Sequence, residues 1–596
     1  MATASKKNKS LKKTKKQNKV VKGPHKYIFV IGGVMSGVGK GIATASIGKI
    51  LQSKGFKVNP VKVDPYLNVD AGTMNPTEHG EVFVLDSGLE TDQDMGNYER
   101  FMEVDLTAND YMTSGMVYKA VIDRERSMGY KGKCVEAIPH VTEEITRRLH
   151  ASAIENKSEI SIVEIGGTVG DYQNILFIEA ARVLKIKHPD DVIFIMVSYL
   201  PIPGTLGEMK TRPTQNAVRM LNSYGVQPDI IIARGTEPLD EKRKEKIAVS
   251  CAVRTDHVIS APDIKSVYDV PLNFERDKIG DIILNSLRLD AKKGKEAGPG
   301  LGEWKKFVAR SKKASITDID TALSESANIW PAVNIAVVGK YFDTGHFVLS
   351  DAYLSVIESI KYSCYKEGVR PVLTWVNSKD VETGAIKVEE FVKYQGIIVP
   401  GGFGETGIEG KIAVIKFARE NKIPYFGLCY GMQLLVVEFA RNVAGLKGAH
   451  TTEIKPDAVH PVIDIMPEQK EHMKQGRYGA SMRLGAYTAV LKEGTIAQSA
   501  YGKAEISERH RHRFEVNPAY VEQLEKAGLV FSGKSPDGKL CEITELPING
   551  EAAKNSHPFM LGTQFHPELK ARPLSPHPLF TAFIKASKKR GENGTV

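Results

Sequence analysis

The pattern that most constrains the fold is an alternation of short apolar runs with longer amphipathic stretches, which begins at Tyr27. Such runs are typical of buried parallel strands, and the stretches between them are long enough to form covering helices. We therefore expect an α/β fold. A helix is expected over residues 41–54, where apolar side chains recur on one helical face. The expected strands of the first half cover residues 27–31, 58–63, 160–165, 192–197 and 229–233.

The same alternation starts again after a change in composition. Residues 291–331 are rich in Lys, Gly, Ser and Asp, and their weak periodicity predicts an interdomain linker. A chain of 596 residues is also longer than one hydrophobic core can use. We therefore predict two doubly wound α/β domains, over residues 23–290 and 332–590, with tails at residues 1–22 and 591–596. The expected strands of the second half cover residues 333–338, 396–399, 425–428 and 559–565.

The net charge of +10 is weak evidence for nucleic-acid binding, because most of it lies in one short segment. Residues 1–22 hold nine lysines and no acidic residue, so the rest of the chain is nearly neutral. A lysine block without core-forming residues predicts a solvated tail, and polyanion binding is the minority interpretation. The block also lacks the features of a signal or transit peptide.

The apolar residues and the cysteines indicate the kind of cellular compartment in which the protein works. No window holds 18 consecutive apolar residues, so we expect no membrane span. The five cysteines are widely scattered and form neither a disulfide framework nor a zinc-ligand spacing. We therefore expect a reducing, cytoplasmic environment.

A glycine-rich segment over residues 32–41 lies between an expected strand and an expected helix. Backbone N–H groups of such a loop surround phosphate oxygens, and Lys40 adds a point charge. The usual phosphate-loop template has glycine where Val34 stands and a hydroxyl residue where Gly41 stands. Because that hydroxyl normally holds Mg²⁺, we expect carboxylates from elsewhere to replace it, and Asp94 and Glu164 are the candidates. The structural alternative is a tight strand-to-helix turn.

A second basic, hydroxyl-rich run over residues 210–215 follows the expected strand at 192–197. Its cations and donors suit a second polyphosphate, whereas the alternative is a solvated loop at the start of a helix. Beside a phosphate loop on the same sheet, the run favours two nucleotides, or one nucleotide and a phosphorylated partner.

The second half carries the pattern of a nucleophilic thiol. Cys429 stands between glycines, after an expected strand and before a helical run, which is the arrangement of a nucleophile elbow. His566 can accept the thiol proton, and Glu568 can orient the imidazole. Backbone N–H groups of residues 399–404 can form an oxyanion hole. A lone cysteine is more often a buried apolar residue, but three matching segments favour catalysis.

Longer segments give the chain a clear family resemblance. Over nearly all of residues 25–588 it resembles CTP synthase, whereas the second half alone resembles any class I glutamine amidotransferase. The family implies an N-terminal amidoligase domain and a C-terminal glutaminase domain, which together convert UTP, ATP and glutamine to CTP. The matching segments cover residues 32–41, 61–66, 72–74, 79–82, 163–171, 210–215, 400–404, 427–433, 508–513 and 564–568.

The resemblance also implies roles for individual residues. The implied catalytic residues are Cys429, His566 and Glu568 in the glutaminase and Lys62 in phosphoryl transfer, and the implied Mg²⁺ ligands are Asp94 and Glu164. The implied ATP contacts are Gly37, Val38, Gly39, Lys40, Gly41, Ile42 and Asp94. The implied contacts to UTP, or to CTP as a feedback inhibitor, are Ser36, Asp171, Lys210, Thr211, Arg212, Thr214, Gln215 and Lys246. The implied glutamine contacts are Gly402, Tyr430, Gly431, Met432, Gln433, Glu453 and Arg513.

The family further implies a homotetramer, filament formation and activation by GTP. Two departures bear on regulation. Gln173 stands where the family usually has Glu, so we expect a weaker contact to the pyrimidine nucleotide and altered inhibition by CTP. Thr406 replaces an arginine that the family associates with GTP activation. Lys411 or Arg483 could compensate for that arginine. The lysine tail and an extra stretch over residues 311–330 have no counterpart, and we assign them no catalytic role.

Three other functions compete with this interpretation. A cobyrinic acid amide synthase would share the layout, but residues 210–215 and 508–513 argue against it. A ParA-type switch with a degenerate glutaminase conflicts with an intact Cys429, His566 and Glu568. A protein that binds nucleic acid through its basic N-terminal segment would show a salt-dependent affinity for nucleic acid, and deletion of residues 1–22 would abolish that affinity.

Overall fold

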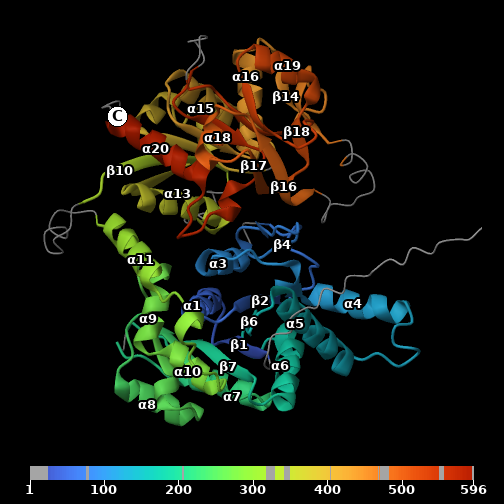
Figure 1. Ribbon diagram of the computed structural model, residues 1–596, viewed down its shortest axis with the longest axis vertical. Coiled ribbons are helices and arrows are strands. Elements are labelled where there is room, and N and C mark those ends of the chain that lie inside the picture. Colours follow the sequence, from blue (N-terminus) through green and yellow to red (C-terminus); the bar gives the residue numbers. More distant parts are fainter. Residues whose placement is uncertain are drawn as a thin grey trace, which may run out of the picture.

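The structure is a computed structural model that describes residues 25–75, 79–204, 207–316, 329–340, 350–402, 404–466, 469, 482–548 and 556–592. Figure 1 shows two α/β units, one above the other, with the C-terminal half at the top. Among the described residues, no helix is both long enough and apolar enough to cross a bilayer.

The N-terminal half is built on one sheet in which all seven strands run parallel. Their order is β5-β2-β6-β1-β7-β8-β9. The five strands expected from the sequence are all present, within two residues at each end. The strands are β1 (Lys26–Gly33), β2 (Val58–Asp64), β5 (Tyr111–Thr113), β6 (Ile160–Ile165), β7 (Val192–Tyr199), β8 (Ile230–Gly235) and β9 (Val258–Pro262).

Helices cover both faces of this sheet because its strands are apolar on both sides. In β1, Phe29 and Ile31 pack into one core cluster, whereas Ile28 and Val30 pack into the cluster on the opposite face. The first face is covered by α5 (Thr142–Asn156), α6 (Ile175–Lys187) and α7 (Arg212–Ser223). The opposite face is covered by α1 (Lys40–Ser53), α9 (Val270–Arg276) and α10 (Ile279–Ser286).

The C-terminal half has a nine-stranded sheet of mixed direction, in the order β11-β10-β12-β13-β21-β20-β19-β16-β17. Its parallel part is β11 (Arg370–Asn377), β10 (Ala332–Gly339), β12 (Gly396–Val399), β13 (Tyr425–Leu428) and β21 (Met560–Thr563). An antiparallel extension that the apolar pattern did not predict follows: β20 (Cys541–Glu545), β19 (Val530–Lys534), β16 (Arg483–Leu491) and β17 (Glu505–His512). Helices α13 (Leu354–Glu367) and α20 (Pro578–Glu592) cover one face, and α15 (Ile408–Glu420) and α16 (Tyr430–Asn442) cover the other. The two halves therefore confirm the predicted α/β class.

Part of the expected linker is a packed helix, α11 (Gly302–Ala314), which runs between the halves in Figure 1. Trp304 is 1% exposed, and its indole N–H donates to the carbonyl of Tyr268 at 2.9 Å. The same core cluster holds Tyr362 of the C-terminal half, so α11 joins the two halves through apolar contact. Of the extra stretch at 311–330, residues 317–328 lie outside the described residues. The domain limits stay predictions.

Candidate active sites

The glycine-rich loop lies where the sequence predicted it, between β1 and α1. Gly37 and Gly39 have φ values of 69° and 86°, which explains why the loop needs glycine at both positions. Val34 also has a positive φ, 78°, so a β-branched residue adopts the conformation for which the template uses glycine. The ammonium of Lys40 donates to the carbonyl of Gly167 at 2.8 Å, and burial lowers its pKa.

The structure explains why a hydroxyl residue is missing at Gly41. A Cβ atom there would lie 2.1 Å from Oδ1 of Asp94, which is closer than real contacts allow. Asp94 belongs to α3 (Gln93–Met102), and its backbone N–H donates to the N-cap side chain of Asp92 at 2.8 Å. The carboxylate of Asp94 therefore occupies the space that the side chain of a Ser or Thr would need.

The two predicted metal ligands converge on one point. The ammonium of Lys62 lies 2.5 Å from Oδ2 of Asp94 and 3.0 Å from Oε1 of Glu164. Burial opposes the charge of Lys62, but the two carboxylates outweigh it and raise the pKa of this lysine well above its ordinary value. Burial raises the pKa of Glu164, whereas at Asp94 the nearby charge of Lys62 outweighs burial and lowers the pKa. The carboxylates thus surround a position where positive charge is stabilised.

This donor set fits Mg²⁺. Mg²⁺ is commonly held by one or two carboxylates together with substrate phosphates and water. No cluster of three or more potential ligands that could hold a metal ion occurs among the described residues. Asp94 and Glu164 would therefore share the ion with phosphate oxygens, next to Lys40.

The residues predicted to contact the pyrimidine nucleotide differ in their exposure and in their hydrogen-bond partners. Oδ2 of Asp171 accepts from the backbone N–H of Thr168 at 2.6 Å. The hydroxyl groups of Thr214 and Ser198 are 2.8 Å apart and buried, and Thr211 bonds Gln215. Ser36, Arg212 and Lys246 are exposed, and Lys210 pairs with Glu208 at 2.6 Å.

Cys429 forms the predicted elbow between β13 and α16. Its φ and ψ of 49° and −97° are strained for a residue with a side chain. The backbone N–H of Cys429 donates to the carbonyl of Thr563 at 2.6 Å, which fixes the turn to the neighbouring strand β21. Its Sγ faces the carbonyl of Arg511 at 3.9 Å and the side-chain amide of Gln564 at 3.7 Å. The thiol is therefore held in a defined position.

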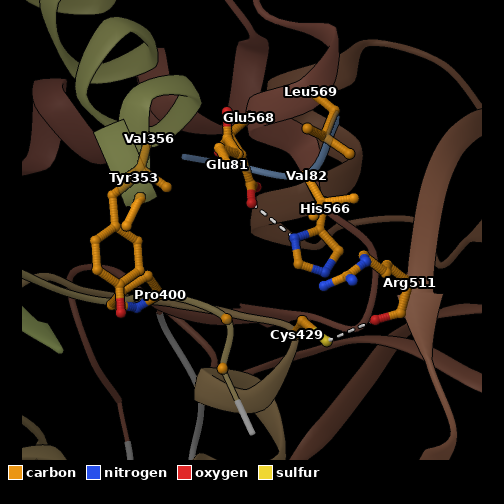
Figure 2. Close-up of a pocket in the computed structure, with 13 residues that line it drawn as sticks. Glu81, Val82, Tyr353, Val356, Pro400, Cys429, Arg511, His566, Glu568 and Leu569 are labelled. Carbon is orange, nitrogen blue, oxygen red and sulfur yellow. Dashed lines mark hydrogen bonds and ion pairs between the residues drawn. The ribbon is translucent and has the colours of Figure 1, made fainter. Parts of the chain in front are cut away.

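The imidazole of His566 lies between Glu568 and Cys429 (Figure 2). Its Nδ1 is 2.7 Å from Oε1 of Glu568, and within the described part of the chain its buried Nε2 makes no hydrogen bond. Burial lowers the pKa of His566, but the charges of Glu568 and Cys429 outweigh burial and raise it to about 10. The free nitrogen can exchange a proton with the thiol or a leaving group, while Glu568 fixes the ring.

The residues predicted to bind glutamine differ in their surroundings. Gly402 lines the same cavity as Cys429, and Oε1 of Glu453 accepts from the backbone N–H of Gly404 at 3.2 Å. Gln433 is instead buried, and its side-chain amide donates to the carbonyl of Phe514 and to the side chain of Gln564. These contacts predict a structural role for its side chain. The other members are Tyr430, Gly431 and Met432, buried in the first turn of α16, and Arg513, which bonds Gln469 at 3.3 Å.

Two residues of the N-terminal half line the Cys429 cavity, although no individual role is predicted for either of them. These residues, Glu81 and Val82, lie just before β3 (Phe83–Val84). Their segment matched the family resemblance, but no local pattern placed them beside a thiol that follows more than 340 residues later. The cavity therefore belongs to both halves of the molecule.

Buried ion pairs hold the halves together beside this cavity. The guanidinium of Arg509 donates to both oxygens of Glu99 at 2.8 and 3.1 Å, and Arg572 donates to Glu99 at 2.5 Å. Arg511 pairs with Glu90 at 2.8 Å. The carbonyl of Arg509 also accepts from the backbone N–H of His566 at 2.8 Å. The interface thus connects directly to the segment that carries the imidazole.

Comparisons with known families agree with this geometry. Residues 348–586 match the family model described as glutamine amidotransferase class-I. Together with the elbow cysteine and the His566–Glu568 pair, this match assigns the C-terminal half to the class I glutamine amidotransferases. Residues 26–289 match the model described as CTP synthase N-terminus.

Individual relatives extend over almost the whole chain. CTP synthase from Pyrococcus furiosus is 48% identical over 573 residues, which cover 96% of this chain and 99% of the relative. CTP synthase from Methanococcus aeolicus is 46% identical over 568 residues, covering 94% and 98%. The chain belongs to the CTP synthase family. A solved Trypanosoma brucei CTPS glutaminase domain with bound acivicin is 36% identical, with a TM-score of 0.38, and covers 43% of this chain and 94% of that one.

Proposed function

We propose that this protein aminates UTP at C4 to give CTP, with ATP as the cosubstrate and glutamine as the nitrogen source. The observation that carries the proposal is the coexistence of a phosphate loop and an elbow thiol in one chain whose relatives are CTP synthases. The rival amide synthase has no support from these relatives.

At the thiol site, the Sγ of Cys429 attacks the carboxamide carbon of glutamine, and His566 delivers a proton to the departing nitrogen. The products are a glutamyl thioester and ammonia. Water then hydrolyses the thioester to glutamate and restores the thiol. Glu568 keeps the imidazole in the orientation that both proton transfers need, through the contact at 2.7 Å.

At the nucleotide site, Lys40 and the loop N–H groups position the ATP phosphates, and Lys62 stabilises the negative charge of the transferred phosphoryl group. Asp94 and Glu164 would hold Mg²⁺, which neutralises phosphate charge when it is bound. The O4 of UTP becomes a phosphate ester, and ammonia displaces that phosphate at C4. Asp171, Thr211 and the neighbouring hydroxyl groups are the proposed contacts of the pyrimidine nucleotide.

Regulation and assembly are further parts of the proposal. CTP would inhibit at the UTP contacts, GTP would activate glutamine hydrolysis, and the chain would form a cytoplasmic homotetramer. Thr406 predicts weak GTP activation, and Arg483 is a poor substitute for the missing arginine because it pairs with Glu515 and Glu542 at 3.0 and 2.7 Å. Burial lowers the pKa of Lys411 to about 7, which leaves this lysine a weak cation as well.

The test is the absorbance change of UTP incubated with the purified protein, ATP and Mg²⁺, with either glutamine or ammonia. We expect CTP formation with both nitrogen sources and none without ATP. Failure to form CTP from ammonia would contradict the proposed activity, because that reaction needs only the nucleotide site.

A further inference from the structure

Two buried glutamines lie beside the thiol without lining its cavity. Gln564 directly follows β21 and is 0% exposed, and Gln433 lies in the first turn of α16 and is 2% exposed. Neither is among the described residues that form the cavity wall around Cys429. Gln564 therefore approaches the sulfur from the protein interior. Amides buried this deeply are costly unless they are hydrogen-bonded, so their partners indicate what they do.

One backbone carbonyl determines the orientation of both amides. The carbonyl of Phe514 can only accept, so the group of Gln433 that lies 2.9 Å from it is the amide nitrogen. This nitrogen also donates to Oε1 of Gln564 at 3.3 Å, which turns the nitrogen of Gln564 toward Sγ of Cys429 at 3.7 Å. Rotation of either amide by half a turn would place two donors or two acceptors face to face. The chain of bonds thus directs an N–H donor at the nucleophile.

The carbonyl at the start of this chain is itself fixed. Phe514 begins β18 (Phe514–Val516), which pairs with β15 (His460–Ile465). Nδ1 of His512 donates to the same carbonyl at 3.1 Å. Burial lowers the pKa of His512 well below its ordinary value, so the ring is neutral and its one N–H is on Nδ1. The orientation of Gln433 therefore rests on a rigid, neutral support.

The donor from Gln564 matters most when the sulfur is ionised. The thiol form can donate its own proton to the carbonyl of Arg511 at 3.9 Å, whereas the thiolate can only accept. Hydrogen bonds to an ionised acceptor are roughly twice as strong as those between neutral groups. The amide N–H of Gln564 therefore stabilises the thiolate more than the thiol, and the thiolate is the nucleophile.

We propose that Gln564 is a catalytic residue that stabilises the thiolate of Cys429, and that Gln433 is the residue that positions it. When His566 takes the thiol proton, the amide of Gln564 donates to the sulfur anion. When water hydrolyses the thioester, the C–S bond breaks, its electron pair returns to sulfur, and the same amide donates again. Gln564 neither gains nor loses a proton. The proposal rests on the function proposed above.

The first test follows the alkylation of Cys429 by iodoacetamide from about pH 5 to 10, measured by mass spectrometry of the peptide that contains this cysteine. Only the thiolate reacts, so the rate reports the thiolate fraction. Gln564→Met removes the amide at similar side-chain length, and its alkylation profile is expected to shift to higher pH by about one unit or more.

This shift reports on the amide and not on a general disturbance. The charged or titratable side chains that line the cavity with Cys429 are Glu81, Arg511, His566 and Glu568, and the variant keeps all four. A side chain with a purely structural role could reduce the amount of folded protein, but it would not move the pH at which the thiol reacts.

The second test measures CTP formation with glutamine and with ammonium chloride. In Gln564→Met, kcat with glutamine is expected to fall about tenfold or more. The KM for glutamine is expected to stay within about threefold, because Gln564 does not line the cavity. Turnover with ammonium chloride, which does not need the thiol, is expected to stay within about twofold.

Two further variants complete the comparison. Gln433→Leu leaves Gln564 in place but removes the donor that orients it, so its alkylation profile is expected to shift in the same direction by a smaller amount. Gln523→Met, on the exposed face of α19 (Pro518–Lys526), is the control and is expected to match the unmodified protein.

An alkylation profile that is unchanged in Gln564→Met would overturn the proposal. If that variant does not fold, an unchanged profile in Gln433→Leu would overturn it instead. Absence of CTP from the unmodified protein would contradict the proposed function, whereas the alkylation profiles would still decide the role of Gln564.

Discussion

His566 shows at the scale of one residue how charge and burial compete. Burial alone would lower the pKa of its imidazole, but Glu568 at 2.7 Å and Cys429 raise it to about 10. The protonated ring therefore stabilises the folded state. This contribution is complete below the ordinary pKa of 6.5 and is lost as the pH rises through about 10.

Glu568→Gln is expected to lower the pKa of His566 toward its ordinary value and to free the ring from its fixed orientation. Glutamine-dependent turnover should fall by about 10²- to 10⁴-fold, while ammonia-dependent turnover persists. Chemical unfolding from pH 6 to 10 should show a smaller loss of stability in the variant. Glu522→Gln on an exposed helix is the control, and a variant with normal glutamine-dependent turnover would contradict the role of Glu568.

At the scale of elements, helix α3 links the two sites. Asp94 lies in its first turn and contacts Lys62, whereas Glu99, about one and a half turns later, binds Arg509 of β17. The first turn of α3 packs so closely on α1 that Gly41 has no room for a side chain. The nucleotide site therefore depends on the spacing of two helices.

Gly41→Ala is expected to displace the carboxylate of Asp94 and to reduce CTP formation from glutamine and from ammonia alike. A displacement of about 1 Å at a catalytic group can cost about 10²-fold in rate. Steady-state turnover with both nitrogen sources measures this effect. Gly302→Ala, where a Cβ meets nothing within 4 Å, is the control. Unchanged turnover in Gly41→Ala would contradict the packing explanation.

The parts of the site that lie in local patterns could be predicted from the sequence. The phosphate loop, Asp94 and Cys429 each stand next to an apolar strand or a helix start that fixes their position. The antiparallel strands could not be predicted, because β17 alternates histidines with Arg509 and Arg511 and lacks an apolar run. Contacts such as Arg509 to Glu99 join residues 410 positions apart, so no spacing in the sequence reveals them.

At the scale of the whole molecule, a buried charge network determines how the halves meet. Glu99 is fully buried and accepts from Arg509, from Arg572 and from the backbone N–H of Leu106. Removing one member of such a network leaves uncompensated buried charge, which costs more than the pair contributes in isolation. The interface is therefore sensitive to a change of one atom in Glu99.

Glu99→Gln is expected to destabilise the protein by about 3–5 kcal/mol, because two guanidinium groups lose their shared carboxylate. Denaturant unfolding measures the change. Glu103→Gln is the control on the neighbouring turn, since Glu103 makes its bonds to Leu574 and Ser575 at the surface. Equal stabilities of the two variants would contradict the importance of the buried network.

The central claim is that one chain makes ammonia at Cys429 and uses it at the nucleotide site that contains Lys40. The most direct measurement compares CTP formation from glutamine and from ammonia in Cys429→Ala and Lys40→Ala. We predict that Cys429→Ala loses only the glutamine-dependent reaction, whereas Lys40→Ala loses both and still hydrolyses glutamine at a basal rate. Loss of both reactions in Cys429→Ala, or substantial ammonia-dependent turnover in Lys40→Ala, would contradict the claim.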